Sequence, residues 1–214
     1  MAKQSKIDDL IGQLSDDLEP RKPLAHPLWR AAPLILISLI YVGATISMIG
    51  PREDWIPKMY QEIDYIFEFT LSLGIFITST FALCWMCVPD MRGQQWVKSV
   101  PLTLAAVFCL WAALRIIFEW GQPVVFEWKN CSLDGFIMLM LPAAILTFAS
   151  RRGSTTQPVW SSSIAVLAFC GLGWSGLRLT CGANTFLQSF AVNFIPFIVL
   201  GVIFGIFARR IFRW

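Results

Sequence analysis

The chain has 214 residues and a formal net charge of +3, and 56% of its residues are hydrophobic whereas only 14% are charged. Soluble domains carry about 25% charged residues, so this composition and a mean hydropathy of +0.62 exclude an ordinary soluble enzyme and indicate a membrane protein. Ten of the 31 charged residues lie within residues 1–30. We therefore expect a polar head at residues 1–30 and a membrane domain at residues 31–214.

The head contains one short amphipathic pattern. Apolar residues recur within residues 5–18 at i, i+3, i+4, i+7 and i+11, which predicts a helix with a single apolar stripe. The stripe consists of Ile7, Leu10, Ile11, Leu14 and Leu18, and the other face carries Asp8, Asp9, Asp16 and Asp17. Helices that lie on membranes usually carry Lys and Arg, and an isolated helix this short is marginal in water. We expect it to bind a basic groove on a partner protein, with docking on the protein's own inner loops as the alternative.

A proline-rich tether is expected to follow this helix. Pro20 is predicted to end the helix, and Pro23 and Pro27 to keep the chain extended as far as Arg30. His26, the single histidine, is interpreted as a solvated linker residue.

Six apolar runs after the head have roughly the length of about 17–25 residues that a helix needs to cross the hydrocarbon core. The runs are 31–49, 65–88, 99–120, 135–150, 160–180 and 191–208. Pro142 and Pro196 lie inside the fourth and sixth runs, where membrane helices tolerate proline. The expected fold class is all-α, a six-helix transmembrane bundle with an N-terminal cytoplasmic amphipathic helix.

The basic residues are distributed unequally between the two sets of connecting segments. Twelve of the 17 Lys and Arg residues lie in the head and after the second, fourth and sixth spans, and only Arg52, Lys58 and Lys129 lie on the other side. Cytoplasmic segments carry the excess of Lys and Arg. We therefore expect both termini in the cytoplasm.

Six cysteines fall into two groups by expected depth. Cys84 and Cys87 have C-x-x-C spacing at the inner end of the second span, where we favour membrane packing over redox or metal chemistry. Cys131, expected in the loop after the third span, and Cys181, at the end of the fifth, are predicted to face outward. An oxidising compartment permits a disulfide and two thiols can bind a soft metal, so a reversible sensor pair and a permanent staple both stay open.

Charged residues inside spans usually have a function, and four are expected at the depth of the outer cysteines. They are Glu68, Arg115, Glu119 and Arg178. Arg115 and Glu119 are spaced to pair on one helix, and Glu68 and Arg178 could pair between helices, with snorkelling to the interface as the alternative. The small-residue spacings Gly171…Ser175 and Gly201…Gly205 favour packing within one bundle over a homodimer seam, which stays open.

Taken together, the parts of the chain resemble the NrsF-type membrane anti-sigma factors. The resemblance rests on the order Asp8-Asp9-Leu10-Ile11, Leu14, Asp17-Leu18 and Pro20-Arg21-Lys22-Pro23-Leu24, followed by six spans, two outward cysteines and a terminal Arg213-Trp214. It implies a protein of the bacterial inner membrane whose head sequesters an extracytoplasmic-function sigma factor. The resemblance also implies that the outward pair, Cys131 and Cys181, receives the signal, namely metal or oxidative stress. The residues expected to contact the partner are Ile7, Asp8, Asp9, Leu10, Ile11, Leu14, Asp17 and Leu18.

We therefore expect a regulator and not an enzyme. Its expected partners are the sigma factor and the lipid bilayer, without direct nucleic-acid binding. No resident cofactor is expected, beyond a transient thiophilic metal at Cys131 and Cys181 with Asp134 as an additional oxygen ligand. The alternatives are a membrane thiol-disulfide oxidoreductase, which the two cysteine pairs suggest, and a small transporter, which Pro142, Pro196 and the intramembrane charges suggest.

Overall fold

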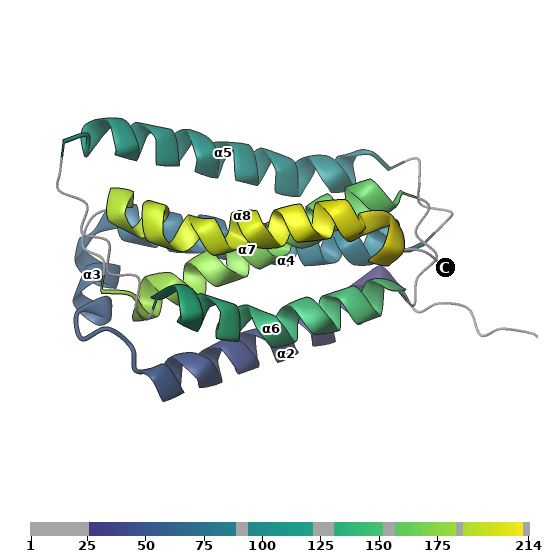
Figure 1. Ribbon diagram of the computed structural model, residues 1–214, viewed down its shortest axis with the longest axis horizontal. Helices are drawn as coiled ribbons and strands as arrows, with labels where there is room; N and C mark the ends of the chain where they lie inside the picture. Colours follow the sequence, from purple (N-terminus) through teal and green to yellow (C-terminus); the bar gives the residue numbers. More distant parts are fainter. Residues whose placement is uncertain (1–25, 89–93, 122–130, 152–156, 183–185, 212–214) are drawn as a thin grey trace, which may run out of the picture.

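The computed structural model describes residues 26–88, 94–121, 131–151, 157–182 and 186–211. Within these ranges the ordered elements are all helices, and no strand occurs. The helices are α2 (Pro27–Ile49), α3 (Trp55–Gln61), α4 (Ile63–Met86), α5 (Trp96–Phe118), α6 (Cys131–Arg151), α7 (Pro158–Thr180) and α8 (Phe186–Ile211) (Figure 1). The amphipathic helix expected at residues 5–18 lies outside the described residues and stays a prediction.

Five helices, α2, α4, α5, α6 and α7, are long and apolar enough to cross a membrane. α8 has 26 residues. Its segment Phe197–Phe207 is apolar, and the structure describes the side chains of this segment. Each of the six expected spans coincides with one of these six helices. The all-α, multi-span fold class is confirmed, with the sixth span corresponding to α8.

Two helices begin four residues earlier than the apolar runs indicated. α2 starts at Pro27, which has the fixed φ suited to a first helical turn, and His26 caps it by accepting the Leu28 N–H at Nδ1 (3.4 Å). The expected tether therefore ends at His26, and the histidine is a helix cap instead of a plain linker residue. α6 starts at Cys131 with Asp134 in its first turn, where the helix dipole favours a carboxylate. Cys131 thus lies at a helix start and not in the expected loop.

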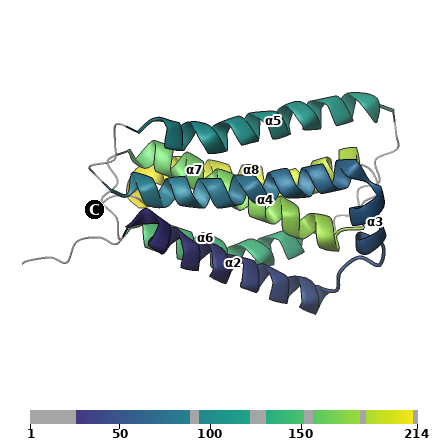
Figure 2. The ribbon, with the colours of Figure 1, turned by 180° about the vertical axis from the view of Figure 1, so that it is seen from behind.

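The helices run roughly side by side, with α4 and α7 in the interior (Figures 1 and 2). α2 and α6 lie on one side, α5 lies on the opposite side, and α8 packs against α7. α2 begins where α4, α6 and α8 end, and we call this the head end. The opposite end carries α3, a short helix that the sequence did not predict, and we call it the α3 end; the expected topology places it outside.

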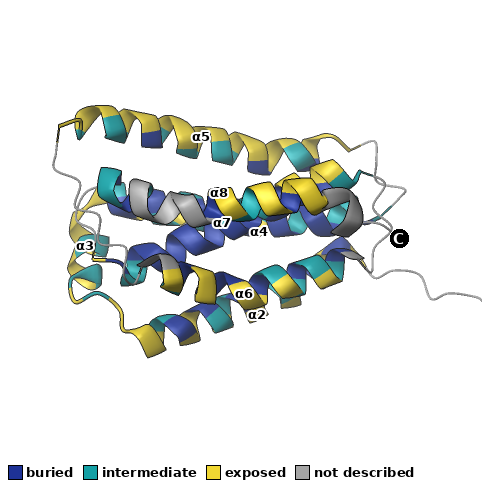
Figure 3. Ribbon diagram, in the orientation of Figure 1, coloured by how far each residue is buried: buried dark blue, intermediate teal, exposed yellow. Residues whose placement is uncertain are grey.

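Of the five helices that are long and apolar enough to cross a membrane, α7 is the most enclosed, because small residues let its neighbours come close. In the most apolar 18-residue stretch of α7, 67% of the residues are buried. The corresponding share in α5 is 11%, and α5 is exposed along most of its length (Figure 3). A Cβ placed on Gly171 would lie 2.5 Å from the Ser72 carbonyl oxygen and 2.8 Å from the Phe76 nitrogen. Only glycine permits this approach of the α7 and α4 backbones, and the predicted packing role of this position within the bundle is confirmed.

Candidate functional site

Cys181 immediately follows α7 at the α3 end. Its N–H caps the helix by donating to the Leu177 carbonyl at 2.7 Å, and its side chain is buried. Cys181 is disulfide-bonded, whereas Cys84, Cys87, Cys109 and Cys170 are free. The Cys131 side chain lies outside the described part of the structure, so its predicted pairing with Cys181 stays a prediction.

Arg52, between α2 and α3, holds the end of α7 in place. Its N–H donates to the Leu179 carbonyl at 3.0 Å, and its Nη1 donates to the Cys181 carbonyl at 3.1 Å. The same guanidinium forms a two-pronged ion pair with Asp54, and the Nη2–Oδ2 distance is 2.9 Å. Hydrogen bonding to Arg52 holds the pKa of the Asp54 carboxyl below its usual range. Bidentate pairs of this type fix geometry as well as charge.

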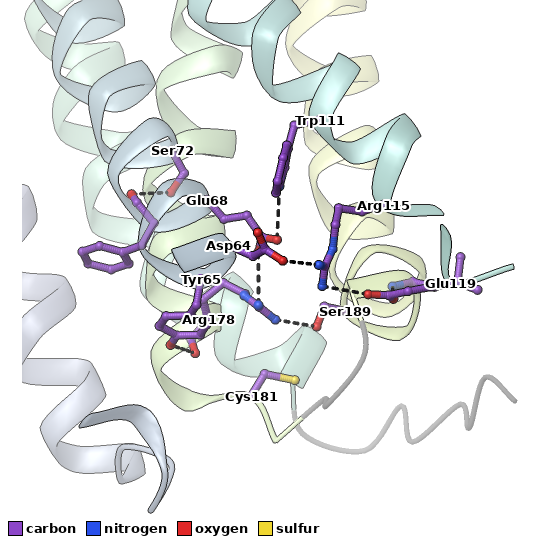
Figure 4. Close-up of polar contacts among 12 residues, drawn as sticks. Asp64, Tyr65, Glu68, Ser72, Trp111, Arg115, Glu119, Arg178, Cys181 and Ser189 are labelled. Atoms are coloured by element: carbon purple, nitrogen blue, oxygen red, sulfur yellow. Dashed lines mark hydrogen bonds and ion pairs between the residues drawn. The ribbon is translucent and has the colours of Figure 1, made fainter. Parts of the chain in front are cut away.

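A buried ion pair joins α4 to α7 close to Cys181. Arg178 Nη2 lies 3.1 Å from Glu68 Oε2, and both side chains are buried. Arg178 also donates to Ser189 Oγ at 3.1 Å and lies over the Tyr65 ring at 4.8 Å, while the Tyr65 hydroxyl donates to the Arg178 carbonyl at 2.6 Å. Trp111 on α5 reaches Glu68 Oε1 at 3.4 Å (Figure 4). The pair is therefore embedded in contacts from four helices.

A second, half-exposed ionic group lies beside it and includes α5 and α8. Arg115 binds Asp64 on α4 through Nη1, and its Nη2 lies 2.9 Å from Glu119 Oε1. The other Glu119 oxygen accepts the backbone N–H of Leu187 at 2.9 Å, at the start of α8. We refer to Asp64, Glu68, Arg115, Glu119 and Arg178 as the ionic cluster (Figure 4). It ties α4, α5, α7 and α8 together at the α3 end.

The ionic cluster contains all four span charges singled out from the sequence. Both expected pairs, Arg115 with Glu119 and Glu68 with Arg178, are confirmed. The burial of Glu68 and Arg178 shows that these two charges do not snorkel. Sequence reasoning missed Asp64, although it stands one turn before Glu68, and it counted Arg52 only as an outer basic residue. Trp111 could have been found from the sequence, because it lies four residues before Arg115 and therefore on the same face of the helix.

The C-x-x-C cysteines lie at the head end, in a different environment. Cys84 and Cys87 are buried and free, and Cys87 Sγ donates weakly to the Ser150 carbonyl at 3.6 Å. Apolar neighbours from α2 and α6, Leu34, Leu146 and Ala149, surround them together with Arg30. These contacts are those of small hydrophobic side chains in a helix interface.

Chemically, the site couples several elements of the bundle through ion pairs and hydrogen bonds. Within the described ranges no group of three His, Cys, Asp or Glu side chains could hold a metal ion. The arrangement instead connects Cys181, the end of the central helix and charges from three other helices. These features define a multi-helix protein with the character of a multi-pass membrane protein and a polar coupling site at one end of its bundle.

Comparison with known proteins identifies the family. The model of the NrsF family, described as "Negative regulator of sigma F", matches residues 14–214. The chain belongs to the NrsF family, which indicates a negative regulator of a sigma factor and thus a regulatory protein. No curated protein and no solved structure matches the chain.

Proposed function

We propose that this protein is a membrane anti-sigma factor. The stripe of residues 5–18 sequesters an extracytoplasmic-function sigma factor in the cytoplasm, and a cysteine pair at the α3 end, facing outward, controls release. The protein acts by binding alone, in the bacterial inner membrane, with both termini inside. The observation that carries the proposal is the placement of a bonded Cys181 at the end of the most enclosed helix.

The contacts around Cys181 supply a route from the outer face into the bundle. Arg178 precedes Cys181 by one helical turn, so a displacement of Cys181 acts directly on the Glu68–Arg178 pair. Glu68 belongs to α4, which makes the most extensive helix contact with α7. Because packed helices move as units, a change at Cys181 is transmitted to the inner ends of both helices.

Cys131 is the proposed partner of Cys181. The expected topology places both residues on the outward side, and the disulfide-bonded state of Cys181 supports the pairing. A thiophilic metal requires two thiolates, so it can bind only after this disulfide is reduced. The proposed resting form is therefore the dithiol, which an oxidant that takes up two electrons and two protons converts to the disulfide, or which binds a thiophilic metal with loss of its thiol protons. Both products join the start of α6 to the end of α7, and the free dithiol does not.

The head is tested with charges in its apolar stripe. In the Leu10→Glu, Leu14→Glu double variant, each charge replaces a side chain that must be buried, which is unfavourable by at least a few kcal/mol. Co-purification of the sigma factor from native membranes should fail, and sigma-dependent transcription should rise without an inducer. Gln13→Glu, on the polar face of the same helix, is the matched control and should sequester normally. Normal sequestration by the double variant would refute the helix-in-groove mode.

The cysteine switch is tested separately. Cys131→Ser and Cys181→Ser should each retain sequestration and lose induction by oxidant or thiophilic metal, and the double variant should match the single ones. Cys109→Ser, at a free and exposed thiol, is the control and should induce normally. If both single variants release the sigma factor under inducing conditions, the pair is a staple and the signal enters elsewhere.

Reporter fusions test the orientation. Fusions at Gln94 and Gly153 should report the cytoplasm, and fusions at Glu53 and Lys129 the exterior, because twelve basic residues flank one side and three the other. An exterior signal at Gly153 would contradict the assignment.

The oxidoreductase alternative receives no support from the geometry. Cys84 and Cys87 lie at the head end and Cys181 at the α3 end, so the length of α4 separates the two thiol groups. We therefore retain a single proposed function.

A further inference from the structure

Aromatic side chains from four helices meet at the head end of the bundle. His26, the cap of α2, packs edge-on against Trp85 near the end of α4, with ring centroids 6.0 Å apart. Trp85 in turn contacts Trp96, the first residue of α5, with ring centroids 6.1 Å apart. Lys98, two residues later, places its Nζ 5.6 Å from the ring centroid of Trp160, in the first turn of α7. We call His26, Trp85, Trp96, Lys98 and Trp160 the head-end track.

The head-end track is open to contact from outside the bundle. Trp96 is 56% exposed and Trp160 is 46% exposed, and His26 is exposed as well. Each member of the track lies within one turn of a helix end, so the track crosses the end of the bundle from α2 to α7. Exposed rings at such a place offer a surface on which apolar side chains can be buried.

The charge of the head end is opposite to that of the expected head helix. The helix ends and connecting sequences there carry eight basic residues and a single acidic one, Asp90. The basic residues are Arg30, Arg92, Lys98, Arg151, Arg152, Arg209, Arg210 and Arg213. Residues 5–18 carry four Asp and only one basic residue, Lys6. The head helix and the head end are therefore electrostatically complementary, whereas an anionic inner leaflet repels this helix.

The head joins the bundle at the head-end track itself. The described residues begin at His26, which forms one end of the track. Residues 19–25 reach roughly 25 Å when extended, and a helix over residues 5–18 is about 21 Å long. α2 packs on α4 and α4 packs on α5, and two such interhelix spacings measure about 16–20 Å. The head helix can therefore reach the track and matches its length.

We propose that the head helix docks through its apolar stripe on the head-end track, so that the bundle competes with the sigma factor for the same stripe. A short tether gives an effective concentration on the order of 1 mM. A contact with an intrinsic dissociation constant of about 0.1 mM then keeps about nine heads in ten docked, and raises the apparent dissociation constant of the sigma factor about tenfold. The competition rests on the proposed function, and the docking itself does not.

Docking is tested in the full-length protein without any partner. The photocrosslinker benzoylphenylalanine replaces Leu14, in the stripe, and the protein is placed one copy at a time in nanodiscs of phosphatidylethanolamine and phosphatidylglycerol. We expect crosslinks around Trp96 and Trp160, identified by mass spectrometry. The same crosslinker at Gln13, on the polar face, is the control and should give at least fivefold less of them. Crosslinks to lipid alone, or none, would overturn the proposal.

Substitutions in the track locate the docking surface. The Trp96→Ala, Lys98→Glu double variant removes an exposed ring and reverses a charge, and should lower the yield of these crosslinks at least tenfold. Trp120→Ala, at an 80% exposed tryptophan of the α3 end, is the matched control and should not. An unchanged yield in the folded double variant would overturn the proposal. If that variant fails to fold, 1 M salt decides, because it shortens the Debye length to about 3 Å and should lower the yield several-fold in the unsubstituted track.

The competition is tested with the sigma factor that co-purifies with the protein. The Trp96→Ala, Lys98→Glu double variant should bind it about tenfold more tightly than the protein without these substitutions, and Trp120→Ala should bind it with unchanged affinity. Equal affinity in all three proteins would overturn the proposed competition. If none of the three binds a sigma factor, the proposed function fails, and the crosslinks still decide whether the head docks.

Discussion

The two ends of the bundle place cysteines at the ends of the two interior helices, yet they use them differently. At the head end, Cys84 and Cys87 are free and buried among side chains of α2 and α6. At the α3 end, Cys181 is bonded, and its carbonyl is held by Arg52. Burial is similar at both ends, so burial does not distinguish a packing cysteine from a candidate sensor. The distinguishing feature is the set of polar contacts to other elements.

Charge follows the same division. The ionic cluster lies entirely at the α3 end, and its buried pair joins the interior helices there. A buried charge that loses its partner is strongly destabilising. A substitution that breaks the buried pair at the α3 end should therefore lower the free energy of unfolding strongly. At the head end, Cys87 has a weak sulfur contact to the Ser150 carbonyl and a hydrogen bond with Arg30, but no buried ion pair between carboxylate and guanidinium lies among the described residues there. Substitutions at the two ends should therefore differ most where a buried charge is left unpaired.

The largest effect is expected from breaking the buried ion pair. Arg178→Met leaves the Glu68 carboxylate buried without its partner, and the free energy of unfolding should fall by about 3–5 kcal/mol. Denaturant unfolding in detergent, followed by circular dichroism, measures this loss. The double variant Glu68→Gln, Arg178→Met is the control and should recover much of the stability. A single variant as stable as the double one would show that Glu68 is not charged in the folded protein.

A smaller effect is expected at Arg52. Arg52→Gln removes the guanidinium that binds the Cys181 carbonyl and Asp54, and hydrogen bonds of charged groups contribute about 1.5–3 kcal/mol. The Cys181 disulfide should be reduced several-fold faster by dithiothreitol, measured by mass spectrometry after alkylation. Lys58→Gln removes the other ion-pair partner of Asp54 without touching Cys181, and should leave the rate unchanged. Equal rates in all three proteins would remove Arg52 from the proposed route.

The head-end cysteines should be the most tolerant of the cysteine positions. Cys84→Ala and Cys87→Ala each remove one buried sulfur, and we expect a cost of about 1 kcal/mol or less, close to that of losing one buried methylene. Sequestration and induction should both persist, in contrast to Cys181→Ser. Transcription from a sigma-dependent promoter, with and without the inducer, measures the difference. Loss of induction in Cys87→Ala would show that the head-end cysteines are also needed for signalling.

The smallest expected effect depends on pH. The pKa of Asp54 is lowered in the folded protein, chiefly by its hydrogen bond to Arg52. Its contribution is therefore present above the unfolded pKa of about 3.9 and is lost as pH falls through the lower folded value. The protection of backbone amides at the end of α7 against hydrogen exchange, relative to their intrinsic rates, should fall below about pH 4, and Asp54→Asn should abolish this pH dependence. A pH profile unchanged by Asp54→Asn would assign the effect to another carboxyl.

The sequence predicted the features that depend on local pattern. Apolar runs located six helices, and the i, i+4 spacing found the Arg115–Glu119 pair. The Glu68–Arg178 pair could also be predicted from the sequence, because opposite charges at the same depth in a membrane bundle usually pair with each other. α3 and the contacts of Arg52 were not accessible, since they depend on how a loop folds across the end of α7. Helix starts at Pro27 and Cys131 escaped a hydropathy reading because caps and dipoles, rather than apolar length, set them.

The close backbone contact at Gly171 makes this residue a pivot point about which α7 can rotate. Where Gly171 touches the backbone of α4, side-chain rearrangement cannot absorb a shift, so α7 cannot slide there without the backbones of the two helices colliding. It can tilt. At 1.5 Å per residue the arm to Cys181 is about 15 Å long and the arm to Pro158 about 20 Å. A displacement at the Cys181 end is therefore delivered at the Pro158 end in the opposite direction, and slightly enlarged.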